Sequence, residues 1–475
     1  MTVDLSGTLH DGSVAIANGE LGVALVSDGS NQRFIGLITD GDVRRAILMG
    51  ADSKTPLEKI VNRNAKTAKQ DTSSESIAQL LSHEVRAIPI LNDIGIAVDI
   101  IVLDKRMRLP VSEPYLNEKE LGYVTDCIVS GWISSSGKYV EKFESLVAEV
   151  SNAKFGIATS SGTAALHLAL LAAGVSRGDE VIVPALTFIS TATAVLHAGG
   201  TVVLVDIDEE TMCIDPDLFF AAITPRTKAV IPVHLYGHPA QMNRLLEIAK
   251  QHEICVIEDA AEAQGATFDG SQVGSLGDMG IFSFYGNKTI TTGEGGMVVT
   301  NDFQLAEKIR VLRDHGMDPN RRYWHTMLGF NYRMTNLQAA VGVGQMEKFS
   351  EILQRKRIVA ESYSRLLSKV PGVVLPCEKA WANHSYWLYT ILIDLPKIKN
   401  VRNLVIYALE EQNIEARPVF IPIHKQPIFK ITGDFPVAER MANKGISLPS
   451  FATLKYADIE KICDVIKKTI FSLMI

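Results

Sequence analysis

The chain has 475 residues, of which 47% are hydrophobic and 21% charged, so it can bury a large core and is long enough for roughly two to four domains. Its formal net charge of -7 argues against the broad basic surface of a nucleic-acid-binding protein. No membrane span, secretory signal or metal site is expected. Pro184 and Gly199-Gly200 interrupt the most apolar region, the N-terminus lacks a basic segment before an apolar one, and the five cysteines contain no CxxC pair. The expected compartment is the cytoplasm.

The first hundred residues contain a short α/β pattern that occurs twice. The first copy predicts two strands around a tight turn, followed by an amphipathic helix, at 22–28, Gly29-Ser30-Asn31, 34–40 and 42–50. A weaker copy covers 71–103 and predicts a helix and two further strands, at 75–84, 86–91 and 96–102. The repetition indicates one small domain made of two similar halves.

This duplicated region resembles a cystathionine-β-synthase (CBS) repeat pair. In the segment FIGLITDGDVRRAI, Thr39 and Asp42 carry the TxxD spacing with which that family binds ribose. The second copy lacks these two residues. The resemblance therefore leaves two interpretations open, a nucleotide effector site within residues 1–105 or a degenerate pair that serves packing or oligomer contacts.

The charged run at 104–108, followed by Pro110, predicts a domain boundary. Beyond it, apolar strand-like runs alternate with helical segments: FGIATS, VIVPAL, TVVLVDI, AVIPVHL, ICVIEDA, IFSFY and GMVVT. Such alternation predicts a mostly parallel sheet flanked by helices. A long charged helix near 345–370, a strand in YWLYTILID and a closing helix predict a smaller C-terminal lobe. We therefore expect an α/β protein with a first domain at 1–108, a large domain at 109–345 and a small domain at 346–475.

A single lysine, Lys288, lies in GIFSFYGNKTITTGEGGMVVT, after an apolar strand and before a glycine-rich turn. The ends of strands in α/β sheets line the ligand crevice. A lysine shielded from water there can lose its proton and form a Schiff base. A lysine in a loop is otherwise most often a solvated charge, so only the motifs around Lys288 support a catalytic role for it.

Two further segments supply those neighbours. In VIEDAAEA, an apolar run delivers Asp259 to the end of a strand, where a carboxylate is costly unless it is paired with a cation or caps a helix. In ATSSGTAALHLALLAAG, a helix that starts after Gly162 offers backbone amides to a phosphate, or is simply capped. Between them, Phe188 follows a strand and can stack on a flat ring or belong to the core.

The order of these elements resembles the fold-type I pyridoxal-phosphate enzymes of the DegT/DnrJ/EryC1/StrS nucleotide-sugar aminotransferase family. The likeness covers about 110–475 and rests on PVSEPYLNEKELGYVTDCIVSGWISSSGKYVEKFE, VHLYGHP, GNKTITTGEGGMVVTND, YWHTMLGFNYRMTN, RPVFIPIHKQP and GISLPSF. It implies pyridoxal 5'-phosphate as cofactor and Lys288 as the residue that binds it covalently. It also implies the other cofactor contacts: Asp259 on the ring nitrogen, Phe188 on the ring face, Glu262 near the ring hydroxyl, and Gly162, Thr163 and Ser283 on the phosphate.

The resemblance also implies a homodimer with shared active sites, since Asn331 matches an asparagine that a neighbouring subunit adds to the phosphate site. The sugar-nucleotide pocket is assigned to four residues that could alternatively pack the lobe: Arg321, Tyr386, Phe420 and His424. The implied reaction uses glutamate to form pyridoxamine 5'-phosphate, whose amine then replaces the C4 ketone of a 4-keto-6-deoxy nucleotide sugar. GDP-4-keto-6-deoxymannose is the expected substrate.

Three alternatives remain. A sugar 3-dehydratase on the same scaffold is disfavoured, because that branch has histidine in place of Lys288. A UDP-linked 4-keto sugar as substrate stays open, since nucleotide choice depends on scattered pocket residues. A primarily nucleotide-sensing protein is the third alternative, and an intact lysine, aspartate and phosphate seat argue against it.

Overall fold

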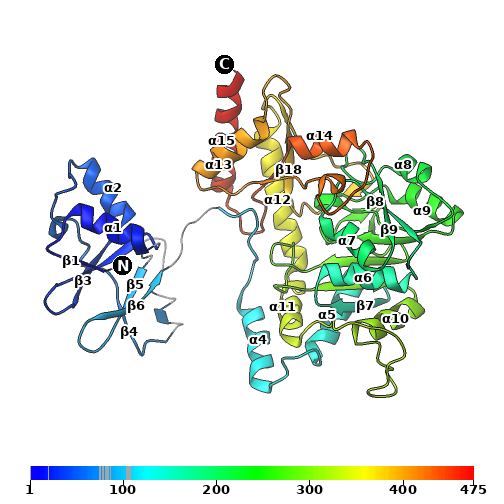
Figure 1. Cartoon of the computed structure of the whole chain (residues 1–475), viewed down its shortest axis with the longest axis horizontal. Coiled ribbons are helices and arrows are strands. Elements are labelled where there is room, and N and C mark those ends of the chain that lie inside the picture. Colours follow the sequence, from blue (N-terminus) through cyan, green and yellow to red (C-terminus); the bar gives the residue numbers. More distant parts are fainter. Residues whose placement is uncertain are drawn as a thin grey trace. The chain divides into compact units, whose positions relative to one another are not determined.

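The structure, a computed structural model, describes residues 2–19, 21–73, 76, 77, 80, 85, 87–102 and 109–474. The chain divides into two compact units, residues 1–108 and 109–475 (Figure 1). The charged run at 104–108 and most of the helix predicted at 75–84 lie outside the described residues. Within the described ranges, no helix is both long enough and apolar enough to cross a membrane.

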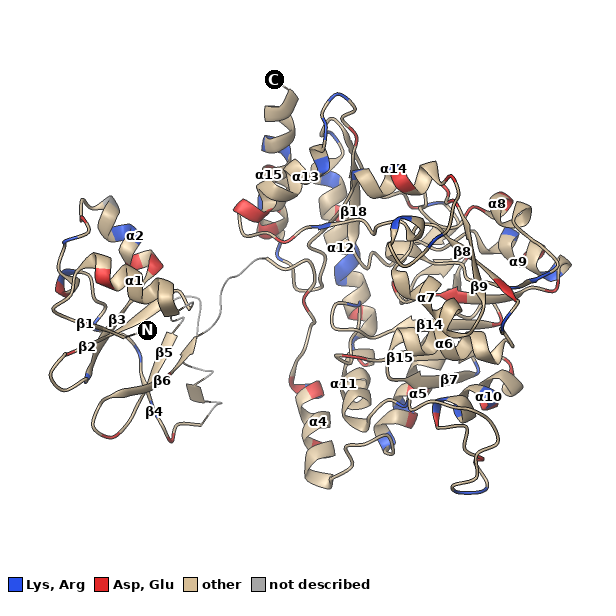
Figure 2. Ribbon diagram, in the orientation of Figure 1, with Lys and Arg blue, Asp and Glu red and all other residues tan. Residues whose placement is uncertain are grey.

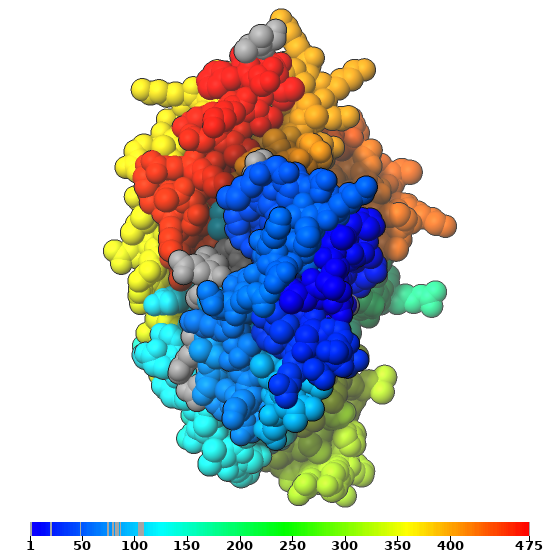
Figure 3. Space-filling view, turned by 90° about the vertical axis from the view of Figure 1, so that its left-hand side faces the viewer, coloured from blue at the N-terminus to red at the C-terminus, as the bar shows by residue number. Residues whose placement is uncertain are grey.

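The first unit has two halves with the same order of strand pairing. In each half a parallel pair is followed by an antiparallel hairpin, so the two predicted hairpins are confirmed: β1 (Thr2–Asp4), β2 (Val23–Ser27) and β3 (Phe34–Thr39), then β4 (Ala68–Lys69), β5 (Ala87–Leu91) and β6 (Ala97–Val102). The first half also contains α1 (Leu9–Gly19), α2 (Asp40–Leu48) and the 3-10 turn η1 (Leu57–Lys59). Val23, Leu37 and Ala87 form a small core between the halves. Both halves form one continuous blue surface in Figure 3.

The second unit is built on a seven-stranded sheet of order β7-β15-β14-β11-β10-β8-β9. All its strands run parallel except β15, and they match the seven predicted runs: β7 (Phe155–Thr159), β8 (Glu180–Pro184), β9 (Thr201–Val205), β10 (Thr227–Val230), β11 (Cys255–Asp259), β14 (Met279–Ser283) and β15 (Gly296–Thr300). Most of these strands are uncharged and buried, as expected when helices cover both faces (Figure 2).

Helices flank this sheet and confirm the predicted α/β class: α4 (Glu118–Ser130), α5 (Lys138–Val150), α6 (Gly162–Ala172), α7 (Ile189–His197), α8 (Pro216–Ala221), α9 (Met242–Gln251), α10 (Phe303–Arg313) and α11 (Asn336–Met346). The 3-10 turn η2 (Leu235–Gly237) follows β10. The short strand β12 (Thr267–Phe268) pairs with β13 (Ser271–Gln272) on one side and with β17 (Ala382–Asn383), which precedes the sheet of the C-terminal lobe, on the other.

The C-terminal lobe has its own antiparallel sheet of order β16-β18-β20-β19 and its own core. Its elements are α12 (Phe349–Leu367), β16 (Val373–Val374), β18 (Tyr389–Ile393), α13 (Val401–Glu411), β19 (Arg417–Pro418), η3 (Ile423–Lys425), α14 (Pro436–Lys444), β20 (Gly445–Leu448) and α15 (Tyr456–Met474). The long charged helix predicted near 345–370 is confirmed as α12, which begins at Phe349, shortly after α11 ends at Met346. Between them Lys348 turns inward to pair with Glu120, which separates the two helix axes.

Candidate active site

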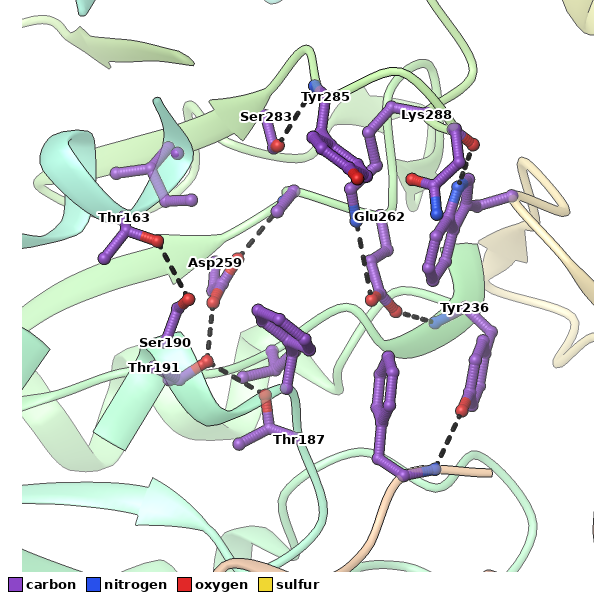
Figure 4. A pocket seen from close by; sticks show the side chains of 18 of the residues that line it. Thr163, Thr187, Ser190, Thr191, Tyr236, Asp259, Glu262, Ser283, Tyr285 and Lys288 are labelled. Carbon is purple, nitrogen blue, oxygen red and sulfur yellow. Dashed lines mark hydrogen bonds and ion pairs between the residues drawn. The ribbon is translucent and has the colours of Figure 1, made fainter. Parts of the chain in front are cut away.

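A cavity of about 410 Å³ opens at the carboxyl ends of the parallel strands, next to the C-terminal lobe. Strand ends of this kind are where α/β proteins bind ligands. Eight of the residues singled out in the sequence line the cavity: Gly162, Thr163, Phe188, Asp259, Glu262, Ser283, Lys288 and Phe420. They come from segments far apart in the chain, and Figure 4 shows five of them around one space: Thr163, Asp259, Glu262, Ser283 and Lys288.

Lys288 lies after β14, with its side chain only 11% exposed. Its Nζ is 3.6 Å from Glu262 Oε1 and 3.8 Å from the centre of the Trp387 ring. Burial lowers the pKa of Lys288, although the carboxylates of Glu262 and Asp259 oppose that shift. A lysine whose pKa is lowered by burial loses its proton more readily and can then act as a nucleophile.

Asp259 ends β11 in a buried position beside that lysine. Its Oδ2 accepts a hydrogen bond from Thr191 Oγ1 at 2.8 Å, and its Oδ1 accepts one from the Ala261 amide at 3.2 Å. Burial raises the pKa of Asp259 because these two neutral donors do not replace the water it has lost. The element that follows β11 is the short strand β12, not a helix, so Asp259 does not cap a helix start. The carboxylate is placed to pair with a cationic group of a ligand.

The neighbouring carboxylate, Glu258, is already satisfied. It accepts hydrogen bonds from the amides of Gly274, Leu276 and Gly277 and lies 3.0 Å from His234 Nε2. His234 Nδ1 accepts a hydrogen bond from the Ala240 amide, so Nε2 carries the proton that is donated to Glu258. Glu258 therefore stabilises the fold, and Asp259 is the carboxylate with capacity left for a ligand.

The start of α6 forms an anion seat at the opposite end of the cavity. Ser161 caps the helix by accepting the Ala164 amide, while Thr163 Oγ1 and Ser190 Oγ lie 2.8 Å apart. The first amides of a helix lack partners within the helix and carry partial positive charge. With the Ser283 hydroxyl close by, this arrangement fits a phosphate group.

We expect Gly162→Ala to weaken phosphate binding about tenfold. A Cβ at this position would lie 2.9 Å from Ser283 Cβ, so the alanine would push the seat apart. Cofactor dissociation constants measured by fluorescence test this. Gly122→Ala in α4, where an added Cβ meets nothing within 4 Å, serves as control and should leave binding unchanged. Equal affinities in both variants would contradict the assignment.

Aromatic rings form one wall of the cavity. Phe188, 53% exposed, lies 5.6 Å from the Phe420 ring; Phe420 stacks on Tyr236, and Tyr236 on Trp387. Tyr236 adopts a left-handed backbone with φ of 55°, which is strained for a bulky residue. In this conformation its amide donates to Glu262 Oε2 at 2.9 Å. Tyr236 and Trp387 were not identified from the sequence, and neither was Arg417, which also lines the cavity.

The remaining four sequence-predicted residues do not line the cavity in this chain. Tyr386 lies parallel to His384, with 3.9 Å between ring centres, and donates to Glu378. His424 contacts Glu439 and the Phe435 ring. Both residues contact other parts of the lobe, whereas Trp387, next to Tyr386 in the sequence, lines the cavity.

Arg321 and Asn331 belong to the segment between α10 and α11, which extends away from the body of this unit (Figure 1). The guanidinium of Arg321 lies 4.0 Å from the centre of the Trp324 ring. Asn331 is exposed, and its side chain accepts from Arg333 at 3.3 Å. This segment contributes no group to the cavity of its own chain.

Comparison with known proteins agrees with this geometry. The model of the DegT/DnrJ/EryC1/StrS aminotransferase family matches residues 114–467. The chain belongs to this family. It is 47% identical over 358 residues to GDP-perosamine synthase of Caulobacter vibrioides, covering 75% of this chain and 96% of the relative. It is 43% identical over 362 residues to GDP-perosamine synthase of Escherichia coli O157:H7, covering 76% and 98%. The solved PLP-form of Spr1654 from Streptococcus pneumoniae superposes with a TM-score of 0.72 at 27% identity, covering 76% and 98%.

As a member of this family, the protein is an aminotransferase that uses pyridoxal 5'-phosphate. The cavity fits that cofactor. The anion seat at α6 suits the phosphate, Asp259 suits a protonated ring nitrogen, and the buried amine of Lys288 suits a covalent link. The match to the family lies wholly within the second unit.

We expect Glu262→Gln to change how the stability of the cofactor-free protein depends on pH. Burial raises the pKa of Glu262 from 4.5 to about 7. Between these values the unfolded chain loses the proton first, so the contribution of Glu262 is full below pH 4.5 and is lost as pH rises through 7. The loss is on the order of 2 kcal/mol, and glutamine should remove it. Urea unfolding at pH 5 and 7.5 measures this, and parallel curves for both proteins would contradict it.

Proposed function

We propose that the protein transfers an amino group from glutamate to the C4 ketone of a 4-keto-6-deoxy nucleotide sugar, namely GDP-4-keto-6-deoxymannose, giving GDP-perosamine and 2-oxoglutarate. The observation that carries the proposal is the buried pair of Lys288 and Asp259 in one cavity. The sugar is suggested by two relatives named GDP-perosamine synthase, which match over 96% and 98% of their length.

In this proposal each residue has a distinct task. Pyridoxal 5'-phosphate, when bound, carries the amino group between substrates and withdraws electrons from the reacting carbon. Lys288 binds the cofactor covalently and, once released, moves the proton between cofactor and substrate carbons. Asp259 would keep the ring nitrogen protonated, while Glu262 would contact the ring hydroxyl and restrains Lys288, whose Nζ lies 3.6 Å from its Oε1. Phe188 covers the ring face, while the phosphate is held by Gly162, Thr163 and Ser283.

The substrate is tested by mixing the pyridoxamine 5'-phosphate form with either GDP-4-keto-6-deoxymannose or a UDP-linked 4-keto-6-deoxy sugar. Return of the pyridoxal 5'-phosphate absorbance only with the GDP sugar is the expected result. Return only with the UDP sugar would replace the proposed substrate by the alternative. No return with either sugar would overturn the proposed sugar specificity.

We also propose that two copies share their active sites, with Asn331 of one copy completing the phosphate seat of the other. The segment that carries Asn331 exposes large apolar side chains, including Tyr323 (76% exposed) and Leu328 (93%). Such side chains are costly in water and suit a protein interface. A second copy is the occupant that would also bring Arg321 to the substrate pocket.

Mixing two inactive variants tests the shared site. Lys288→Ala chains and Asn331→Ala chains should each be impaired, yet their mixture should regain activity, because one site of a mixed dimer has both residues intact. A mixture no more active than its parts would show that each chain uses its own Asn331 or does not use it.

For the first unit we propose a CBS-like repeat pair that serves structure rather than nucleotide sensing. Thr39 caps α2, with its Oγ1 2.7 Å from Asp42 Oδ2, and Asp42 also pairs with Arg45. The two residues with ribose-binding spacing are thus engaged with each other. Titration of the full chain with ATP, ADP and GDP, and of a chain lacking residues 1–105, tests this. Nucleotide binding that truncation abolishes would restore the effector hypothesis.

A further inference from the structure

Lys356 is a buried cation in the middle of α12. It is 4% exposed, and its Nζ donates to two backbone carbonyls, that of Trp387 at 3.0 Å and that of Ser450 at 2.6 Å. No carboxylate among the described residues forms an ion pair with it. By contrast, Lys348 just before α12 is also buried but lies 2.8 Å from Glu120. Lys356 is therefore a buried ammonium group held only by main-chain oxygens.

Such an arrangement is costly, because an ammonium group loses its hydration when it is buried without a counter-charge. Burial lowers the pKa of Lys356 to about 7. An apolar side chain of similar length would fill the same space without that cost. A polar group in this position orients its surroundings, because its hydrogen bonds fix the positions of the two carbonyl groups.

The first of those carbonyls belongs to a residue of the active site. The Trp387 ring covers Lys288, with 3.8 Å between Nζ and the ring centre. Its indole nitrogen donates to the carbonyl of Asn287 at 2.8 Å, directly before Lys288. The same ring stacks on Tyr236 with an interplanar angle of 8°. Trp387 thus contacts Lys288 through its ring and the Lys288 loop through its indole nitrogen.

The second carbonyl belongs to the loop after β20. Ser450 Oγ accepts from the Tyr389 amide at 2.7 Å and donates to Leu448, while Tyr363 of α12 donates to the carbonyl of Pro449. Residues of α12 therefore hold this loop and the start of β18 together. Trp387 lies two residues before β18, between the left-handed Tyr386, with φ of 50°, and that fixed strand.

We propose that Lys356 is a positioning residue that fixes the backbone of Trp387 so that the indole ring covers Lys288 and excludes water from it. Lys356 touches neither the cavity nor the reacting groups and acts through Trp387 alone. The inference rests on the proposed role of Lys288 but not on the identity of the sugar.

The test measures Lys288 in the cofactor-free protein. Labelling with acetic anhydride across a pH range, followed by peptide mass spectrometry, gives the pKa of the Lys288 amine. In Lys356→Met we expect that pKa to rise by about one unit, because water reaches the amine, which changes the reactive fraction at a fixed pH about tenfold. In the cofactor-loaded Lys356→Met enzyme, kcat should fall while KM for the nucleotide sugar changes little. Lys356→Arg should shift the Lys288 pKa less and lower kcat less than Lys356→Met does.

A double-mutant cycle separates positioning from general destabilisation. Trp387→Leu should shift the Lys288 pKa as Lys356→Met does, and the double variant should shift it no further, because both changes remove one ring contact. Additive shifts, or an unchanged pKa in a folded Lys356→Met protein, would overturn the inference. If Lys356→Met does not fold, Lys356→Gln takes its place in the cycle.

Lys348→Met is the matched control. It also removes a buried lysine near α12, but the side chain of Lys348 pairs with Glu120 and not with Trp387. It should lower stability and leave Lys288 labelling unchanged. A shift equal to that of Lys356→Met would show that any loss of a buried lysine produces the effect, and would overturn the positioning role. Since no sugar enters the labelling, failure of the proposed substrate leaves this test intact.

Discussion

Lys288→Ala is expected to lower turnover by at least about three orders of magnitude while the protein still folds and binds its cofactor noncovalently. The amine provides both the covalent link and the group that moves the proton, so its loss removes two functions together. Glu262 Oε1 lies 3.6 Å from that amine, but a carboxylate cannot form the Schiff base that the amine forms. Cofactor should be retained because the α6 seat, Asp259 and Phe188 are unchanged.

Single-turnover kinetics and cofactor absorbance measure the two effects separately. Added methylamine should recover a small part of the rate, since a free amine can enter the cavity in place of the side chain. Lys250→Ala on the exposed face of α9 controls for the loss of any lysine and should keep full activity. Full activity in Lys288→Ala would show that another residue carries the chemistry.

The sequence predicted the sheet well because its strands are buried on both faces and therefore appear as short, nearly continuous apolar runs. Runs such as Val181–Val183 have side chains buried on both faces of the sheet, and apolar periodicity reports that directly. The ends of the same apolar runs located Asp259, the last residue of β11, and Lys288, in the loop that follows β14. Helical periodicity likewise predicted the long helix near 345–370, which the structure shows as α12.

The aromatic wall could not be predicted in the same way. Tyr386 and Trp387 are adjacent and equally suited to a substrate pocket by residue type. The left-handed backbone at Tyr386 places its ring on His384 and directs Trp387 toward Lys288. The local sequence around Tyr386 does not predict this backbone conformation. Tyr236 presents the same difficulty, although Gly237 after it, with φ of 106°, marks an unusual turn. Which side of a loop faces a cavity depends on contacts with distant segments.

Asp259→Asn should separate stability from function, since its two effects are expected to have opposite signs. In the cofactor-free protein the carboxylate is buried against two neutral donors, and burial raises its pKa. Asparagine removes that desolvated charge, can still contact Thr191, and should leave the cofactor-free protein as stable or more stable by about 1 kcal/mol. With cofactor, the variant should lose about a hundredfold in rate and bind more weakly, because a neutral amide does not keep the ring nitrogen protonated.

Thermal unfolding with and without pyridoxal 5'-phosphate measures this directly, as the rise in Tm on cofactor binding should shrink in Asp259→Asn. The adjacent Glu258 offers a matched control, because it is equally buried but accepts three amide hydrogen bonds and contacts His234. Glu258→Gln should therefore destabilise the protein in both states, since glutamine leaves several of those donors unsatisfied. If both variants behaved alike, Asp259 would be one more structural carboxylate. Opposite behaviour at two neighbouring positions of one strand would show that Asp259 is held in an unfavourable environment which the cofactor relieves.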